Sequence, residues 1–242
     1  MAADATLARL LASAPQLSVG ILTADLGHLD DELRRLEHAG VAMIHTDVMD
    51  GVFCPMLSVG APFVAAQRTA MLKDVHLMVD EPLEKIGPFV KAGADMITFA
   101  VESASNPHRV LRVLGDAANA NDPARGILRG IAVSPGTPLE VVAPLVDELE
   151  YVMLLGIDPG WGGQAFAPGM AARVARVREL IAASGRSVLL GIDGGVTKAN
   201  VAEVAGLGPD VVVTGSAIFD GTADVESNAR MMRSRLVASA AS

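Results

Sequence analysis

The segment Leu29–Gly51 has the sequence LDDELRRLEHAGVAMIHTDVMDG and is predicted to contain one helix followed by one strand. A helical stretch over Leu29–Ala39 leads into the short apolar run Met43–Val48, whose length and composition are typical of a buried strand. The same order recurs along the chain, with amphipathic segments between short apolar runs. This alternation is typical of a parallel sheet whose strands are joined by helices.

Eight short apolar runs are predicted to be strands. They are Leu17–Thr23, Met43–Val48, Asp74–Met78, Met96–Ala100, Gly130–Val133, Tyr151–Ile157, Ser187–Ile192 and Val211–Thr214. The helical stretches between them include Leu29–Ala39, Pro82–Lys91, Pro138–Val146 and Gly169–Ala183. Eight strand-then-helix units without a break predict an α/β fold of the closed (β/α)₈ (TIM) barrel type, with a doubly wound open sheet as the alternative.

The chain has 242 residues, close to the ~250 residues of a typical (β/α)₈ barrel. We therefore predict a single barrel domain over residues 1–242, in which residues 1–15 form a short, Ala-rich helical extension before the first strand. Length alone would also permit two small domains, but no linker divides the sequence. Glycine-containing turns at residues 92–95 and 206–210 are predicted to join a helix end to the next strand.

Composition and charge exclude several functional classes. Apolar residues make up 51% of the chain and aromatic residues only 3%, which suits a large core of small branched side chains. The net charge of −9 argues against nucleic acid, because phosphate neutralisation needs clustered Lys and Arg. No apolar run approaches the ~20 residues of a membrane helix, and no basic segment precedes an apolar stretch at the start.

The single cysteine, Cys54, cannot form an internal disulfide and fits a reducing compartment. We therefore expect a cytoplasmic homo-oligomer that binds neither nucleic acid nor membranes. A phosphorylated metabolite is compatible with the acidic charge, since backbone amides and helix N-termini can bind phosphate.

Titratable residues occur at the ends of three predicted strands, and in such a barrel the active site lies at the carboxyl ends of the strands. His45 and Asp47 share one face of the second strand, because alternate residues point the same way. The third strand ends in DVHLM with His76, and the seventh ends in GIDGG with Asp193. Two imidazoles and two carboxylates predict a site for a divalent transition metal with coordination left open for substrate.

Taken singly, each feature has an ordinary structural interpretation. A His-x-Asp pair is often only hydrogen-bonded, a lone histidine such as His76 is often a core residue, and Asp193 before two glycines suits a turn. Their convergence in one predicted barrel is what favours the metal site. His28, His38 and His108 fall on or beside helices and are expected to be solvated.

Three glycine-containing loops follow neighbouring strands late in the chain. They contain Gly162, Gly163 and Gln164 after the sixth strand, Gly194 and Gly195 after the seventh, and Gly215 and Ser216 after the eighth. Glycines let backbone N–H groups approach an anion, and barrels often bind phosphate after strands seven and eight. Each loop alone could be a plain turn, but together they predict a phosphate-binding site.

Several runs resemble the signatures of the ribulose-phosphate 3-epimerase family. They are Ile44–Gly51 (IHTDVMDG), Asp74–Met78 (DVHLM), Pro159–Gln164 (PGWGGQ), Ile192–Gly195 (IDGG) and Gly215–Phe219 (GSAIF), in the family's order and spacing from about Leu17 to Phe219. The resemblance implies a ribulose-phosphate-binding (β/α)₈ barrel. It also implies metal ligands at His45, Asp47, His76 and Asp193, acid/base carboxylates at Asp47 and Asp193, and active-site methionines at Met49 and Met78.

The sequence departs from this family at positions near the expected site. Family residues are replaced by Gly20, Val52, Met56, Ala100, Leu155, Asp158 and Gly191. Gly20 takes the place of a serine, Val52 and Ala100 of histidines, and Met56 of an asparagine. The metal-binding and phosphate-binding residues are retained, so the departures put in question only which sugar phosphate is bound.

The reaction that the resemblance implies is 3-epimerisation of a ketose phosphate, first of all D-ribulose 5-phosphate to D-xylulose 5-phosphate. A proton leaves one face of the carbon beside the ketone and another arrives on the opposite face, which two carboxylates can perform as base and acid. A divalent cation can stabilise the enediolate between these steps. Histidine ligands favour zinc, with iron, cobalt or manganese as alternatives.

Two other functions stay open from the sequence. One is 3-epimerisation of another ketose phosphate, such as allulose 6-phosphate. The other is non-catalytic binding of a sugar phosphate, which the lost polar residues favour and the retained Asp47 and Asp193 oppose. Related barrels with decarboxylase or aldol chemistry resemble each other in an Asp-x-Lys-x-x-Asp run, which residues 73–76 (KDVH) lack.

Overall fold

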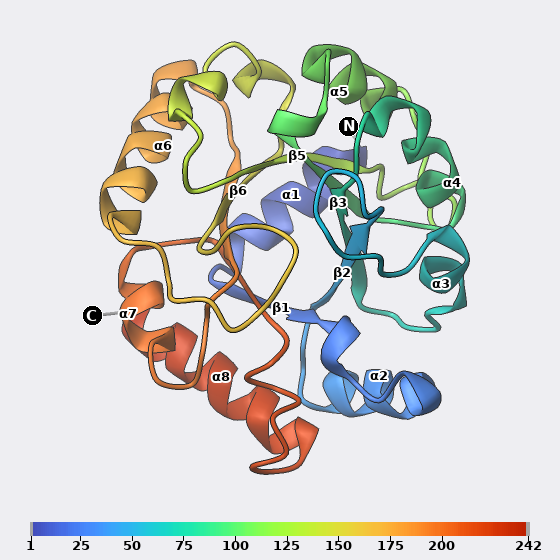
Figure 1. Cartoon of the computed structure of the whole chain (residues 1–242), viewed down its shortest axis with the longest axis vertical. Helices are drawn as coiled ribbons and strands as arrows, with labels where there is room; N and C mark the ends of the chain where they lie inside the picture. The colour runs from blue at the N-terminus through green and yellow to red at the C-terminus, as the bar shows by residue number, and fades with distance from the viewer. Residues whose placement is uncertain (1, 241–242) are drawn as a thin grey trace.

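A computed structural model of the chain describes residues 2–240. Eight parallel strands form a closed barrel in which each strand pairs with the next along the chain and β8 pairs back with β1. The strands are β1 (Gln16–Gly20), β2 (Met43–Met49), β3 (Leu72–Met78), β4 (Met96–Ala100), β5 (Leu128–Val133), β6 (Tyr151–Leu155), β7 (Leu189–Asp193) and β8 (Val211–Thr214). The predicted (β/α)₈ barrel is confirmed, and Figure 1 shows the helices around it.

Helices cover most of the outside of the barrel and its amino-terminal end. They are α1 (Ala2–Ala12), α2 (Leu29–His38), α3 (Ala61–Ala66), α4 (Ile86–Lys91), α5 (Pro107–Gly115), α6 (Met170–Ser184), α7 (Val201–Gly206) and α8 (Val225–Ala240). Short 3₁₀ turns lie at Ile21–Thr23, Leu26–His28, Pro82–Glu84, Val101–Ser103, Leu139–Val141 and Val146–Glu148. Within residues 2–240, no helix combines the length and the apolar character that crossing a membrane requires.

The helix predicted over Pro138–Val146 is wrong, because the structure has only two 3₁₀ turns between β5 and β6. Pro144 explains the difference, since proline lacks a backbone N–H and its ring clashes with the carbonyl four residues earlier in a helix. The backbone bonds here instead span three residues, as from the N–H of Leu145 to the carbonyl of Val142. The apolar residues that predicted a helix here are therefore buried by two 3₁₀ turns instead.

Two predicted strands also end earlier than expected. β1 stops at Gly20, where a 3₁₀ turn begins, and β6 stops at Leu155. Beyond Leu155 the N–H of Gly156 donates to the carbonyl of Asp193, and the carbonyl of Gly156 accepts from the N–H of Ala167. These bonds hold the loop after β6 against the end of β7.

The strands bury side chains on both sides of the barrel wall. Outward-facing residues such as Ile44, Val75 and Ile97 form a large core with the helices. Inward-facing residues near the amino-terminal ends form a second cluster, which includes Met43, Leu72, Met96 and Leu128. Burial on both faces explains why the strands appear in the sequence as short apolar runs.

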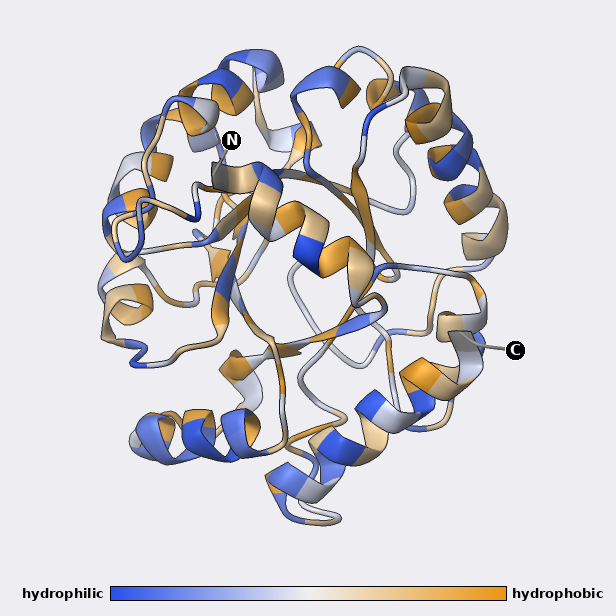
Figure 2. Ribbon diagram, turned by 180° about the vertical axis from the view of Figure 1, so that it is seen from behind, coloured by the Kyte–Doolittle hydropathy of each residue, from blue (hydrophilic) through white to orange (hydrophobic). Residues whose placement is uncertain are grey.

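Helix α1 closes the amino-terminal end of the barrel. Leu7 and Leu10 of α1 are buried and belong to the inner cluster with Met43 and Met96. Figure 2 shows α1 crossing this end of the barrel with hydrophobic residues along its length. At about 1.5–3 kcal/mol per buried side chain, the two leucines contribute roughly 3–6 kcal/mol. The carboxyl end of the barrel is thus the end left for a site.

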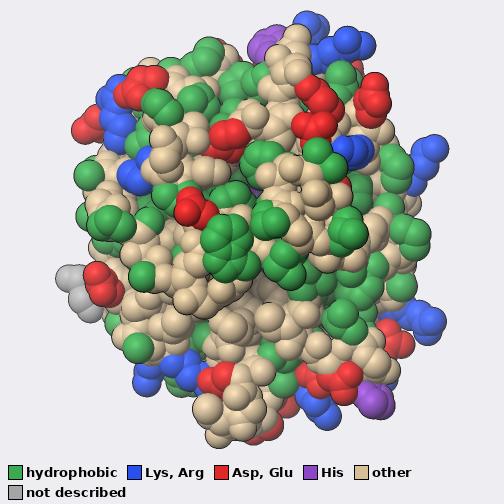
Figure 3. Space-filling model, viewed as in Figure 1, with side chains coloured by type: hydrophobic (Ala, Val, Ile, Leu, Met, Phe, Trp, Pro, Cys, Tyr) green, Lys and Arg blue, Asp and Glu red, His purple; other side chains and the backbone are tan. Residues whose placement is uncertain are grey.

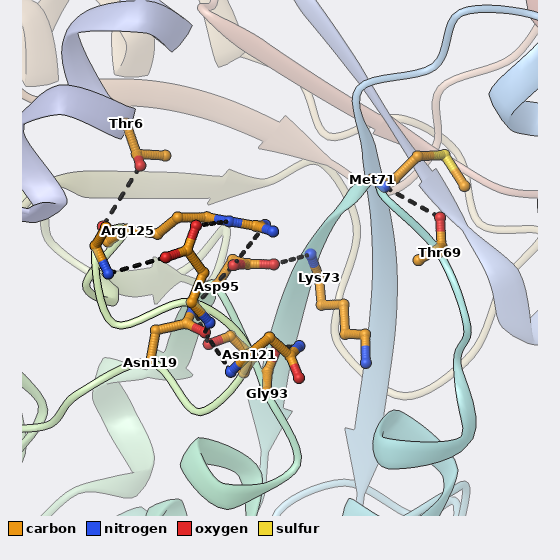
Figure 4. Close-up of polar contacts among 12 residues, drawn as sticks. Thr6, Thr69, Met71, Lys73, Gly93, Asp95, Asn119, Asn121 and Arg125 are labelled. Atoms are coloured by element: carbon orange, nitrogen blue, oxygen red, sulfur yellow. Dashed lines mark hydrogen bonds and ion pairs between the residues drawn. The ribbon is translucent and has the colours of Figure 1, made fainter.

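A polar network supports the closed end (Figure 4). Oδ1 of the buried Asp95 accepts hydrogen bonds from Arg125 Nη1 at 3.0 Å and Asn119 Nδ2 at 2.8 Å. Oδ2 of Asp95 accepts from the backbone N–H of Lys73 at 2.9 Å, and Thr6 of α1 donates to the carbonyl of Arg125 at 3.4 Å. The network therefore links β3, β4 and α1 and leaves the buried carboxylate paired.

Candidate metal centre and substrate cavity

The four predicted metal ligands come together at the carboxyl ends of three strands. His45 and Asp47 belong to β2, His76 to β3 and Asp193 to β7. One ligand atom from each lies within 4.8 Å of those of the other three. Two ligands of one zinc ion, with bonds of about 2.0–2.2 Å, lie at most roughly 4.4 Å apart. A small movement therefore suffices for these side chains to hold such an ion.

Both imidazoles face the same two carboxylate oxygens. Nε2 of His45 lies 3.2 Å from Oδ1 of Asp47 and 3.8 Å from Oδ2 of Asp193. Nδ1 of His76 lies 3.2 Å from that Asp47 oxygen and 3.7 Å from that Asp193 oxygen. The histidine side chains are fully buried, whereas those of Asp47 and Asp193 are 27% and 17% exposed. Two nitrogens and two carboxylates with one accessible side fit a divalent transition metal.

Asp74 orients His45, although it was not among the predicted site residues. Oδ2 of Asp74 lies 2.7 Å from Nδ1 of His45 and accepts a hydrogen bond from Ser18 Oγ at 3.2 Å. A carboxylate on the far nitrogen fixes the tautomer and the ring orientation of a metal-binding histidine. The sequence carried a signal for it, since Asp74-x-His76 repeats the spacing that places two side chains on one face of a strand.

Burial and neighbouring charges push the pKa values in the cluster apart. Burial lowers the pKa of His45, but the Asp74 and Asp47 carboxylates outweigh it and raise that pKa well above its usual value. Burial raises the pKa of Asp47, but His45 and His76 outweigh it and hold that pKa well below its usual range. For Asp193, burial is the main cause that raises its pKa to about 6. The two carboxylates thus differ in their readiness to hold a proton.

A cavity of about 520 Å³ lies at the metal cluster. Asp47, His76 and Asp193 line it, as do the predicted methionines Met49 and Met78. The loops after β6, β7 and β8 also line it, with every residue predicted to bind phosphate: Gly162, Gly163, Gln164, Gly194, Gly195, Gly215 and Ser216. The two predicted groups of residues therefore share one cavity.

Glycine is required at several positions of these loops. Gly163, Gly194 and Gly195 have φ values of 80°, 89° and 72°, which L-residues with side chains rarely adopt. A Cβ atom at Gly194 would also approach Cγ1 of Ile157 to 2.6 Å. The loops after β6 and β7 thus pack closely, and at the glycines no side chain separates the backbone from the cavity.

Gln164 shapes the loop after β6. Its Nε2 donates to the carbonyl of Asp158 at 2.8 Å and to that of Trp161 at 2.9 Å. Both acceptors belong to the same loop, so the amide nitrogen of Gln164 stabilises the conformation of the loop. Trp161, which was not among the predicted site residues, lines the cavity while 50% exposed.

The positions that depart from the family pattern differ in whether they line the cavity. Four of them line the cavity: Gly20, Met56, Leu155 and Asp158. Val52 is 72% exposed and Ala100 is buried, and neither is among the lining residues. Gly191 lies inside the barrel against Tyr151. Of the four replacements of polar groups by Gly20, Val52, Met56 and Ala100, only those at Gly20 and Met56 therefore change the cavity lining directly.

Exposed apolar side chains occur in two of the loops at the carboxyl end of the barrel. In the loop after β2, Val52, Met56 and Leu57 are 72%, 44% and 77% exposed, and Met56 lines the cavity together with Trp161 of the loop after β6. Figure 3 shows hydrophobic side chains gathered in the middle of this face of the molecule. Two exposed apolar side chains thus line the same cavity as the polar cluster.

Comparisons with known proteins find the same family over most of the chain. Residues 16–219 match the sequence model of the ribulose-phosphate 3 epimerase family. The chain is 37% identical over 228 residues to ribulose-phosphate 3-epimerase 2 of Cupriavidus necator, covering 91% of this chain and 90% of that protein. It is 33% identical over 207 residues to ribulose-phosphate 3-epimerase of Bacillus subtilis, covering 84% and 92%.

Solved structures show the same barrel in more distant proteins. Tryptophan synthase subunit alpha from Legionella pneumophila superimposes with a TM-score of 0.64 at 17% identity, covering 98% of both chains. 3-Hexulose-6-phosphate synthase from Salmonella typhimurium has a TM-score of 0.57 at 19% identity, covering 92% of this chain and 99% of that one. At these identities the likeness shows the fold alone.

Proposed function

The chain belongs to the ribulose-phosphate 3-epimerase family, and from this premise we propose that it interconverts D-ribulose 5-phosphate and D-xylulose 5-phosphate. The observation that carries the proposal is the pair of carboxylates, Asp47 and Asp193, that line one cavity beside two buried imidazoles. The glycine-containing loops that line the same cavity support a phosphorylated substrate.

Asp47 and Asp193 are proposed as the acid/base pair. They come from β2 and β7, which are separated in the barrel by β1 and β8, so a substrate carbon held between them would meet one carboxylate on each face. One accepts the departing proton while the other, protonated, donates to the opposite face, and the roles exchange in the reverse direction. In the metal-free protein the two pKa values are shifted in opposite directions, downward for Asp47 and to about 6 for Asp193.

We propose that His45, Asp47, His76 and Asp193 bind one divalent transition metal, with zinc first and iron, cobalt or manganese as alternatives. When bound, the ion supplies Lewis-acid stabilisation of the negative charge that develops on the substrate oxygens. Asp74 keeps Nε2 of His45 directed at the cluster. The protein side chains thereby hold both proton-transferring carboxylates in place.

The loops after β6, β7 and β8 are proposed to bind the phosphate through backbone N–H groups. Their left-handed glycines, such as Gly194 and Gly195, support this role because they bring the backbone close to the cavity. Ser216 adds a hydroxyl at the end of β8. Met49 and Met78 would supply apolar contacts to the carbon chain of the sugar.

We also propose a cytoplasmic homo-oligomer without nucleic-acid or membrane partners. Val52 and Leu57 support an association surface, since exposed apolar patches often mark protein contacts. The unpaired Cys54 supports a reducing compartment. Sedimentation velocity at several protein concentrations, with Leu57→Asp as the variant, tests the oligomeric state.

A second candidate substrate is another ketose phosphate, such as allulose 6-phosphate. Gly20 and Met56 favour it, because both line the cavity where family members carry hydrogen-bonding side chains. Non-catalytic binding has less support, since both acid/base carboxylates line the cavity.

Solvent-isotope exchange tests the proposed reaction. In deuterated water, D-ribulose 5-phosphate should yield D-xylulose 5-phosphate that carries deuterium at C3, since the proton returned comes from a solvent-exchanged carboxyl group. Proton NMR of the product measures the label. Conversion without deuterium at C3 would contradict proton transfer through carboxylates, and binding without conversion would favour the non-catalytic function.

A further inference from the structure

Four buried polar atoms in the barrel have no hydrogen-bond partner among the described residues. They are Oδ1 of Asp74, Nε2 of His76, Oγ1 of Thr98 and the hydroxyl oxygen of Tyr151. All four side chains are on inward-facing positions of β3, β4 and β6, and all four residues are fully buried. Tyr151 belongs to the apolar inner cluster and His76 lines the cavity. Buried polar groups such as these are ordinarily paired.

The barrel provides a specific place for the ring of Tyr151. A Cβ atom at Gly191 of β7 would collide with the tyrosine hydroxyl. One at Gly130 of β5 would collide with Oγ1 of Thr98 and approach Cδ1 of Tyr151 to 3.1 Å. Neither glycine has a positive φ, so the backbone does not require glycine at these strand positions. Glycine on β7 therefore leaves room for the phenol hydroxyl, and glycine on β5 leaves room for Thr98 and the edge of the tyrosine ring.

Asp74 and Tyr151 are chemically complementary. The Asp74 carboxylate only accepts hydrogen bonds, whereas a phenol can donate one, and buried tyrosine hydroxyls usually have a partner. Burial raises the pKa of Tyr151 well above its usual value, and the first of the charges that add to this effect is Asp74. The remaining oxygen of Asp74, Oδ2, already serves His45 and Ser18.

We propose that Tyr151 is a positioning residue for the metal centre: its hydroxyl supplies the hydrogen bond to Oδ1 of Asp74 and so fixes the carboxylate that orients His45. Because the structure shows no direct hydrogen bond between these two atoms, the contact runs through one ordered water, to which the phenol is the donor. This inference rests on the proposed metal centre. Tyr151 touches neither substrate nor metal, so its effect passes through Asp74 and His45.

Metal titration of the metal-free protein is the first test, with zinc and cobalt as the probes. Loss of an outer hydrogen-bond partner typically weakens metal binding 10–100-fold, so we expect a loss of about tenfold or more for Tyr151→Phe. Ser18→Ala removes a hydrogen bond to the same carboxylate and should weaken binding in the same direction. Met153→Leu, at the next inward position of β6, changes only apolar packing and should bind as the wild type does.

Nuclear magnetic resonance provides a second test that does not depend on metal. Tyr151 is the only tyrosine of the chain, so the resonance of a ¹³Cζ-labelled tyrosine is assigned without ambiguity. Asp74→Asn should shift this resonance in the metal-free protein, because the amide replaces a charged acceptor. Asp95→Asn, a buried carboxylate at the closed end of the barrel, should leave it in place.

The outcomes separate this inference from the proposed function. A wild-type protein that bound neither metal would contradict the proposed centre itself. If the wild type binds and Tyr151→Phe binds within twofold of it, while Ser18→Ala weakens binding, Tyr151 has no positioning role. An unchanged tyrosine resonance in Asp74→Asn would overturn the contact even if Tyr151→Phe could not be purified in folded form.

Discussion

Oδ2 of Asp74 lies 2.7 Å from Nδ1 of His45, and this contact leaves Nε2 of His45 facing Asp47 and Asp193. The pair comes from adjacent strands, since His45 of β2 lies directly opposite Asp74 of β3 in the sheet register. Both side chains are fully buried, so the imidazole has little freedom to rotate. The orientation of one proposed metal ligand is thus set by a residue that does not face the metal.

Asp74→Asn should weaken metal binding about 10–100-fold, because an amide orients the imidazole less firmly and removes a charge that makes the ring a better ligand. Calorimetric titration of the metal-free variant with zinc measures the change. Asp95→Asn is the matched control, since it also alters a buried, hydrogen-bonded carboxylate within the barrel wall. Equal affinity in Asp74→Asn and the wild type would refute the orienting role.

His76→Ala should lose most of the bound metal. Its Nδ1 is one of only two imidazole nitrogens in the proposed cluster, and alanine offers no replacement ligand. Elemental analysis of protein purified without chelator gives the metal content per chain. His108→Ala, a change at a largely exposed histidine on α5, should retain it. Full occupancy in His76→Ala would exclude the proposed site.

Asp47→Asn and Asp193→Asn should each lower turnover by at least ~10²–10⁴-fold, the usual effect of losing a general acid or base. Either change can also weaken the metal site, so turnover must be compared at measured metal content. Deuterium exchange at C3 during single turnovers shows whether a variant has lost removal of the proton from C3 or its return to the opposite face. Near-normal turnover of a metal-loaded variant would show that the substituted carboxylate is not part of the pair.

Metal binding should release protons and strengthen as pH rises. The raised pKa of His45 means that the metal-free protein carries a proton there at pH 7, and this proton must leave before Nε2 can bind a metal. We expect release of about one proton at pH 7, and of more below pH 6, where Asp193 with its pKa of about 6 becomes protonated. Calorimetry in buffers of different ionisation enthalpy measures this number. A binding enthalpy that did not depend on the buffer would contradict the raised pKa of His45.

Local patterns sufficed to predict the barrel and the convergence of the four proposed ligands. Strand periodicity places His45 and Asp47 on one face, and the carboxyl ends of all strands of a parallel barrel lie at one end. The convergence of His76 and Asp193 on this pair follows from those two rules. The cluster of four side chains could thus be predicted from the sequence, because each of them lies towards the carboxyl end of its strand.

The features that escaped prediction depend on contacts between distant segments. Tyr151 occupies space left by Gly130 and Gly191, and no local pattern links these three positions. The replacement of α-helix by turns after β5 depends on one residue, Pro144, within an otherwise helical spacing. Likewise, Gly20 lines the cavity, whereas Ala100 is buried and does not line it. Strand spacing alone does not predict this difference.

The replacement of a serine by Gly20 should limit the efficiency of the protein on D-ribulose 5-phosphate. A Cβ atom at Gly20 would lie 3.4 Å from the nearest atoms of Gly215, an ordinary contact, so Gly20→Ser has room to fold. A new hydrogen bond to a substrate hydroxyl of roughly 1–1.5 kcal/mol should raise kcat/KM about tenfold. Steady-state assays with tetrulose, pentulose and hexulose phosphates, beside the unphosphorylated sugars, measure the change for each substrate.

Val52→His provides the matched control, because it also restores a family side chain but at a position that is 72% exposed and does not line the cavity. Its kcat/KM for D-ribulose 5-phosphate should stay within about twofold of the wild type, since an exposed side chain makes no hydrogen bond in the cavity. A larger gain from Val52→His than from Gly20→Ser would show that the cavity contacts are misplaced. Preference of the wild type for an unphosphorylated sugar would contradict phosphate binding by the loops after β6, β7 and β8, whatever the effect of either substitution.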